Sequence, residues 1–306
     1  MKKTEIIFTA TLLFFIFTVI SLLTPVQALA ERKTVSLACA EWSEAVATTN
    51  MAKAIIEKEF GYQCRIISMA ADKMWESVAT GKVDGMLAAW LPTTHAHYYK
   101  QYKDQLVDLG PNITGTQIGL VIPDITVGRQ TASSGARNAP YIKAESLADL
   151  KKYAGQFGRK IIGIDSEAGI MKKTREAIRE YDLYEYQLVE GSEISMTAEL
   201  SNAIRKQRWI VVTGWEPHWI FGRWTLKFLD DPKNIFGGKE KIHTMVRQGL
   251  KEDMPDVYKF LDNFNWKKKE LEQLMIWIQE DKGMYPREKA ERYMRYHPDQ
   301  IKSWLE

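Results

Sequence analysis

Three tryptophans stand at the ends of short apolar runs that predict buried strands. The runs are VSLACAEW, ending at Trp42, GMLAAW, ending at Trp90, and WIVVTGW, ending at Trp215. Strand ends in α/β folds are where ligands bind. Electron-rich indole faces attract cations, and a quaternary ammonium suits them because it is bulky and has no N–H to satisfy. Taken singly, a tryptophan is more often a core residue. Three together predict an aromatic cage for a cation.

An anion site can accompany the cage. The segment DSEAGIMKK, Asp165 to Lys173, follows an expected strand and opens an expected helix. The backbone N–H groups of Gly169 and Ile170 would lie at the helix N-terminus, which favours a carboxylate. His95, five residues after Trp90, can add a side-chain donor. The alternative is a plain strand-to-helix turn, which is the commoner case.

Catalytic and metal sites lack their usual patterns. No G-x-S-x-G motif is present, and no H-E-x-x-H motif or Cys/His cluster accompanies the pair His95 and His97. His218 and His243 are scattered, and we expect them at the surface or just outside a site. We therefore predict no catalytic residue, no metal and no cofactor. An enzyme and an adhesive or structural exported protein remain the rival classes.

The elements that position these residues alternate between strands and helices. Strands are expected at 34–39, 64–69, 85–90, 119–123, 160–164, 186–190 and 209–213. Helices are expected at 44–59, 72–81, 146–153, 169–181 and 196–207, and through most of 254–304. A further, Tyr-rich helix is expected after the strand that ends at Trp90, and it runs through Tyr102. This order predicts mainly parallel sheets.

The fold class that follows is α/β, with two lobes that are each a mainly parallel sheet flanked by helices. This layout is typical of two-lobe (type II) periplasmic binding proteins, which close by a hinge motion around a small ligand. We expect lobe I to contain residues 31–118 and 219–306, and lobe II to contain residues 119–218.

The N-terminus has the pattern of a secretory signal. Lys2 and Lys3 precede an apolar run, and Ala28-Leu29-Ala30 resembles a cleavage site. We predict a signal peptide over residues 1–30, cleavage after Ala30 and a periplasmic location. The alternative is an uncleaved helix that tethers the protein to the membrane.

Composition narrows the class of partner. The 306 residues carry a formal charge of +3 with no basic stripe, which argues against nucleic acid. Both cysteines, Cys39 and Cys64, fall in expected strands. An oxidising compartment permits a disulfide between them. However, one lies late in its strand and the other early in the next, which does not favour disulfide geometry, so two buried free thiols are the alternative.

Several motifs resemble one family. WSEAVATTN, AAWLPTTH, YKDQLVDLG, IDSEAGIMKK, MTAEL and VVTGWEPHW, in this order, are similar to the glycine-betaine-binding proteins of ABC transporters, in the branch typified by the OpuA substrate-binding protein. The resemblance extends from about Lys33 to Trp304. It departs at Asp124 to Lys143, where the family usually runs directly into the next helix.

The resemblance implies a tryptophan cage around a trimethylammonium group, made by Trp42, Trp90 and Trp215. It implies a carboxylate site made by the backbone of Gly169 and Ile170 and the side chain of His95. These are the residues that the strand ends and the helix start had indicated.

The implied ligand is glycine betaine. Choline, carnitine, proline betaine and dimethylsulfoniopropionate remain alternatives, although choline lacks the carboxylate. The implied partner is an inner-membrane ABC permease with ATPase subunits, and we expect a monomer.

Overall fold

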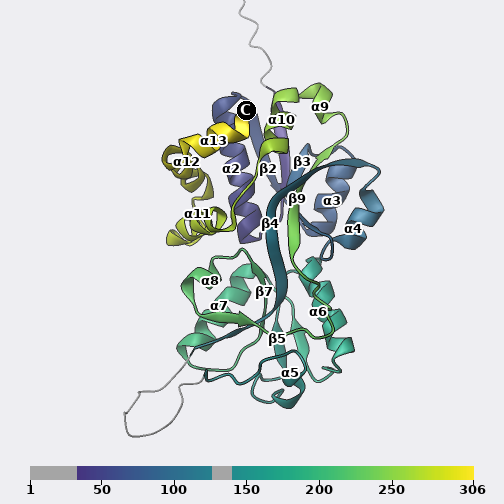
Figure 1. Ribbon diagram of the computed structural model, residues 1–306, viewed down its shortest axis with the longest axis vertical. Helices are drawn as coiled ribbons and strands as arrows, with labels where there is room; N and C mark the ends of the chain where they lie inside the picture. Colours follow the sequence, from purple (N-terminus) through teal and green to yellow (C-terminus); the bar gives the residue numbers. More distant parts are fainter. Residues whose placement is uncertain (1–32, 126–139) are drawn as a thin grey trace, which may run out of the picture. The chain divides into compact units, whose positions relative to one another are not determined.

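Strand β4 (Leu106–Pro123) pairs within one sheet along its first half and within a second sheet along its other half (Figure 1). The structure is a computed structural model, and it describes residues 33–125 and 140–306. Among these residues, the strands follow the order β2-β1-β3-β9-β4-β7-β5-β6, with β8 attached to β4. The two sheets therefore share one long strand.

The remaining strands are β1 (Thr34–Cys39), β2 (Gln63–Ser68), β3 (Gly85–Leu91), β5 (Lys160–Ile162), β6 (Gln187–Val189), β7 (Val212–Glu216), β8 (Leu226–Phe228) and β9 (Glu240–Arg247). The longer helices are α2 (Ser43–Glu59), α3 (Ala71–Ala79), α6 (Gly169–Glu180), α7 (Glu193–Arg205), α10 (Pro255–Asn263), α11 (Lys268–Glu280), α12 (Pro286–Tyr296) and α13 (Pro298–Leu305). Shorter ones are α4 (Ala96–Tyr102), α5 (Asp149–Lys152), α8 (Ile220–Arg223) and α9 (Leu250–Asp253).

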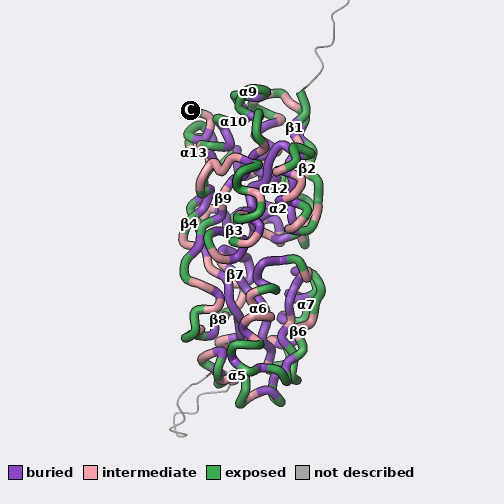
Figure 2. The backbone as a smooth tube through the Cα atoms, turned by 90° about the vertical axis from the view of Figure 1, so that its right-hand side faces the viewer, coloured by how far each residue is buried: buried purple, intermediate pink, exposed green. Residues whose placement is uncertain are grey.

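The first sheet places β3 in its interior. β1 pairs in parallel with β2 and with β3, and β9 lies antiparallel between β3 and β4. Every residue of β3 is buried, whereas the edge strand β2 has exposed residues (Figure 2). This explains the uninterrupted apolar run GMLAAWL, because a central strand in this kind of sheet is covered on both faces.

The second sheet contains both parallel and antiparallel strand pairs. β5 is parallel to β6 and to β7, while β4 is antiparallel to β7 and to β8. The sheets are thus mixed, and the prediction of mainly parallel sheets was wrong in this respect. The cause is β4 and β9, which the pattern did not reveal as long antiparallel strands. β9 contains the buried polar residues Glu240 and Thr244, which hide its apolar face.

The lobe boundaries at residues 119 and 218 remain a proposal. The structure changes the lobe to which one segment is assigned. Leu226–Phe228 was assigned to lobe I, but β8 pairs with the second half of β4, and Asp230 bridges to Ser146. We therefore place the return of the chain to the first sheet after Asp230, and we call the two sheets with their helices lobe I and lobe II.

The two cysteines are free and buried. β1 and β2 pair Val35 with Cys64 and Cys39 with Ser68, which offsets the thiols by four residues, roughly 13 Å along the strands. A disulfide needs Cα atoms within about 7 Å. Burial raises the pKa of each thiol to about 12, so both are unreactive.

Two predictions fall outside the described residues: the signal peptide over residues 1–30 and most of the segment from Asp124 to Lys143. In the part of the chain that is described, no helix combines the length and the apolar character needed to cross a bilayer.

Candidate ligand-binding site

A small cavity lies where strand ends of both sheets meet. All six predicted site residues line it: Trp42, Trp90, His95, Gly169, Ile170 and Trp215. Its walls also contain Glu44, Thr94, Ile118, Ile164 and Ala168. A larger open groove on lobe II, lined in part by Phe157 and Trp209, contains none of the predicted residues. The convergence of separate motifs therefore singles out the smaller cavity.

The tryptophans reach this cavity from three elements. Trp90 is the next-to-last residue of β3, Trp215 lies in β7, and Trp42 occupies the position just before α2. Only 6% of Trp42 and 3% each of Trp90 and Trp215 is exposed. Two of the rings thus come from lobe I and one from lobe II.

One carboxylate holds two of the indoles. Trp90 Nε1 donates to Glu44 Oε1 at 3.2 Å, and Trp215 Nε1 donates to Glu44 Oε2 at 2.8 Å. Because Trp215 belongs to lobe II, the second bond joins the lobes. Each ring is held by its N–H edge, which fixes its orientation around the cavity.

The third indole is held across the lobes by a different carboxylate. Trp42 Nε1 donates to Asp165 Oδ2 at 3.0 Å, and Asp165 lies four residues before the start of α6. An acid therefore orients each ring of the predicted cage.

Glu44 places a buried carboxyl group in the cavity wall. The residue is 2% exposed. Burial, followed by repulsion from Glu193, raises the pKa of its carboxyl to about 8, although the two indole N–H bonds act in the opposite direction. A buried carboxylate of this kind is stabilised by a cation placed beside it. The cavity is thus suited to a positively charged group.

His95 offers a hydrogen-bond donor. Its Nδ1 accepts from the backbone N–H of Trp90 at 3.1 Å and lies 3.4 Å from the donor Trp75 Nε1. Nδ1 is therefore unprotonated, and the proton of the neutral ring is on Nε2. Burial, with His97 adding to it, lowers the pKa of His95 to about 3, so the ring is neutral at physiological pH. Nε2 is buried without a hydrogen-bond partner among the described residues.

The loop that carries His95 is fixed by a second buried acid. Glu240, on β9, accepts from the backbone N–H groups of Thr93 at 2.6 Å and Thr94 at 2.8 Å, and from the Thr94 hydroxyl. The backbone N–H of His95 donates to the carbonyl of Trp90 at 2.9 Å. These bonds set the position of His95 relative to Trp90.

The start of α6 faces the same cavity. The first N–H groups of a helix have no partner within it, and in the described residues no backbone acceptor is found for those of Gly169 and Ile170. Gly169 packs closely on lobe I: a Cβ there would lie 2.4 Å from Thr94 Cγ2 and 2.5 Å from the Thr94 carbonyl oxygen. Only glycine allows this approach.

Sequence reasoning missed the acids that orient the rings. Glu44 lies in the first turn of α2, where an acidic residue is ordinary because it complements the helix dipole. Asp165 follows a strand and looks like a turn residue. His218, expected at the surface or just outside the site, is fully buried, and its ring centroid lies 4.5 Å from that of Trp215.

Comparison with known proteins identifies the family. Residues 33–296 match OpuAC, the substrate binding domain of ABC-type glycine betaine transport systems. The chain belongs to this family. The resemblance seen in the sequence motifs is confirmed.

Two solved structures are similar to this chain over most of its length. Lactococcal OpuAC, in a closed-liganded conformation with glycine betaine, is 35% identical, with 90% of this chain and 100% of that chain covered and a TM-score of 0.79. The glycine/betaine/L-proline-binding protein ProX from Borrelia burgdorferi is also 35% identical, with 90% and 97% covered and a TM-score of 0.81. The predicted α/β binding-protein fold is confirmed, with mixed rather than mainly parallel sheets.

A curated relative is the glycine betaine/carnitine transport binding protein GbuC of Listeria monocytogenes. It is 43% identical over 178 residues, which cover 57% of this chain and 56% of GbuC. The match therefore spans little more than half the length of that relative.

Proposed function

We propose that this chain binds glycine betaine or a related zwitterion outside the cytoplasm and delivers it to an ABC permease. One observation carries the proposal: a single cavity combines three indoles and the buried Glu44 carboxyl group with a neutral donor, His95 Nε2, that has no hydrogen-bond partner among the described residues. The first set suits a quaternary ammonium, and the second suits a carboxylate.

The charges favour a zwitterion over a simple cation. Glu44 and the three rings attract the ammonium group. The carboxylate would accept from His95 Nε2 and from the N–H groups of Gly169 and Ile170. Choline would leave these donors unpaired, and leaving a buried donor without a partner costs about 1–3 kcal/mol.

The proposed cycle requires the lobes to separate. Trp42, Trp90 and His95 come from lobe I, and Trp215, Gly169 and Ile170 from lobe II. The open protein captures the ligand on lobe I, and closure adds the residues of lobe II. The closed form then docks on a membrane permease with ATPase subunits. We propose that the chain acts as a monomer without enzymatic activity, in the periplasm after removal of residues 1–30.

Titration calorimetry with glycine betaine, choline and dimethylsulfoniopropionate tests the ligand class. We expect saturable binding of betaine and at least tenfold weaker binding of choline, from the unpaired donors. Choline binding as tight as betaine binding would refute the assignment of Gly169, Ile170 and His95 to a carboxylate. Absence of binding by all three ligands would refute the proposed function.

Glu44 predicts how closure without ligand depends on pH. In an open form its pKa would be near the ordinary 4.5, and in the closed form it is about 8. The closed form holds the proton more tightly, so closure is favoured at low pH and weakens as the pH rises from 4.5 through 8. We expect the ligand-free closed fraction to fall at least tenfold between about pH 5 and pH 8, since one pKa unit corresponds to a factor of ten.

Fluorophores on Lys206→Cys in lobe II and Lys259→Cys in lobe I report this closed fraction by single-molecule energy transfer. Both lysines are exposed, and the native thiols are too deeply buried to react. Glu44→Gln should remove this fall of the closed fraction between about pH 5 and pH 8. A closed fraction that rises with pH, or that responds equally in Glu44→Gln, would contradict this role of Glu44.

A further inference from the structure

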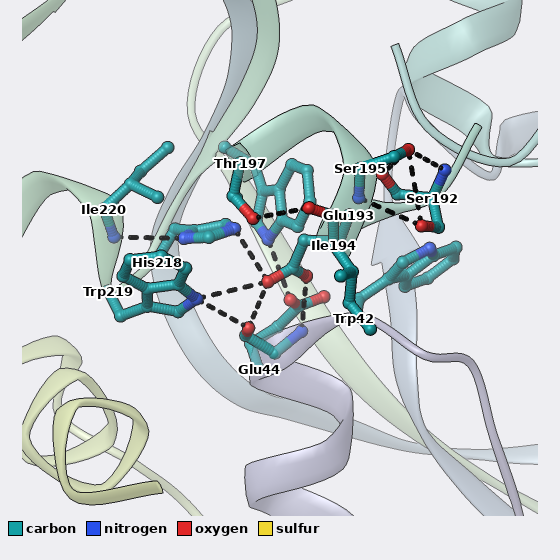
Figure 3. Close-up of polar contacts among 12 residues, drawn as sticks. Trp42, Glu44, Ser192, Glu193, Ile194, Ser195, Thr197, His218, Trp219 and Ile220 are labelled. Carbon is teal, nitrogen blue, oxygen red and sulfur yellow. Dashed lines mark hydrogen bonds and ion pairs between the residues drawn. The ribbon is translucent and has the colours of Figure 1, made fainter. Parts of the chain in front are cut away.

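A second group of polar contacts joins the lobes outside the ligand cavity (Figure 3). Its centre is Glu193, the first residue of α7, which is 7% exposed. The backbone N–H of Ser43 donates to Glu193 Oε2 at 2.8 Å, and the Ser43 hydroxyl donates to Oε1. Ser43 belongs to α2 in lobe I and Glu193 to lobe II. None of these atoms lines the cavity that holds the three tryptophans.

Helix α2 has no N-cap of its own. The N-cap position is occupied by Trp42, whose side chain makes no capping bond. A carboxylate that accepts from a first-turn N–H and complements the helix dipole normally comes from a neighbouring residue in the sequence. Here Glu193 supplies it from the other lobe. Helix α2 is therefore capped only while the lobes are together.

Other donors complete the arrangement around Glu193. Trp219 Nε1 donates to Glu193 Oε1 at 3.2 Å and to the Ser43 hydroxyl at 3.0 Å. His218 Nδ1 accepts from the backbone N–H of Ile220 at 3.1 Å, which places the ring proton on Nε2. That Nε2 lies 3.2 Å from Glu193 Oε1, off the line of a good hydrogen bond. Two carboxylate oxygens thus serve donors from both lobes.

We propose that Ser43, Glu193 and Trp219 form a closing latch, which sets the fraction of closed molecules without contacting the ligand. The inference rests on the hinge closure in the proposed function. Ser43 lies between Trp42 and Glu44, so the latch also positions the turn that brings both residues to the cavity. When the lobes part, Ser43 loses its acceptor and Glu193 loses two donors.

The latch makes a quantitative link between closure and affinity. If only the closed form completes the site and that form is a small fraction of the ligand-free protein, the apparent Kd is inversely proportional to that fraction. A variant that weakens the latch must then raise the Kd by the same factor by which it lowers the closed fraction. A residue with a purely local structural role would not obey this equality.

Glu193→Gln and Ser43→Ala test the latch. The glutamine amide places an NH2 group among donors, so we expect the ligand-free closed fraction to fall about tenfold and the Kd for betaine to rise about tenfold. Ser43→Ala keeps the backbone bond and should change both by about threefold to tenfold. The double variant should bind betaine more weakly than the parent by less than the product of the two single effects, because the two side chains act through one contact.

The matched control is Glu199→Gln, an exposed acid on the same helix, which should leave both quantities unchanged. Closed fractions come from the Lys206→Cys and Lys259→Cys fluorophore pair, and Kd values come from calorimetry. Equal closed fractions in the parent, Glu193→Gln and Ser43→Ala would overturn the latch. If the parent fails to bind betaine, the proposed function fails, and the closed fraction still decides whether the latch exists.

Discussion

Gly169→Ala is expected to weaken betaine binding about 100-fold while leaving the thermal unfolding of the ligand-free protein unchanged. The added Cβ would lie 2.4 Å from Thr94 Cγ2 and 2.5 Å from the Thr94 carbonyl oxygen. Backbone cannot move aside as a flexible side chain can, and overpacking of this kind costs about 1–3 kcal/mol, which corresponds at its upper end to about 100-fold in affinity. Since Thr94 belongs to lobe I and Gly169 to lobe II, the clash exists only in the closed form.

Calorimetry and thermal unfolding of Gly169→Ala test this prediction together. Gly155→Ala is the matched control, because that glycine is also in lobe II and a Cβ there would meet no atom within 4 Å. Unchanged betaine affinity in Gly169→Ala would show that the two lobes do not approach as closely in the bound protein. A large fall in the unfolding temperature would mean that the glycine serves folding rather than closure.

Trp90→Ala and Trp215→Ala should each weaken betaine binding by about 100-fold. Each change removes a desolvated cation–π contact of about 2 kcal/mol. It also removes one of the two indole N–H donors to the buried Glu44 carboxyl group, so the total loss of binding free energy is roughly 3 kcal/mol. The phenylalanine variants separate the two contributions. Trp90→Phe keeps an aromatic face and loses only the N–H, so we expect roughly a tenfold effect.

Trp277→Ala is the control for these tryptophan variants. Trp277 lies on α11, where it packs against Tyr293 and Tyr296 and takes no part in the cavity. Its removal should leave the Kd for betaine unchanged. If Trp90→Ala and Trp215→Ala both bind betaine as well as the parent protein, the aromatic cage is the wrong account of this cavity.

Sequence patterns were sufficient for the elements that follow simple periodicity. β3 is an unbroken buried run, and α6 begins at Gly169, as expected. β9 was missed because buried polar residues such as Glu240 interrupt its apolar pattern. The extent of β4 was missed because its first half contains glycines and a proline, and its register with β9 shifts three times.

The candidate site divides in the same way. Tryptophans at the ends of apolar runs and a glycine at a helix start are conspicuous, and the six residues predicted from such cues all line this cavity. The acids Glu44, Asp165 and Glu193 were not predicted, because their partners lie between 46 and 171 positions away. Charged residues near helix starts are ordinary in sequence. Only the folded arrangement shows which of them meet buried indoles.

The burial of the cavity walls has a kinetic consequence. Because the three indoles and His95 are at most 6% exposed, we expect a bound molecule to leave only after the lobes part. Its dissociation rate then cannot exceed the rate at which the lobes part. Contacts that slow the parting of the lobes, such as those of Ser43 with Glu193, lengthen the residence time of every ligand alike. Discrimination among ligands must then come from how readily the lobes close around each one.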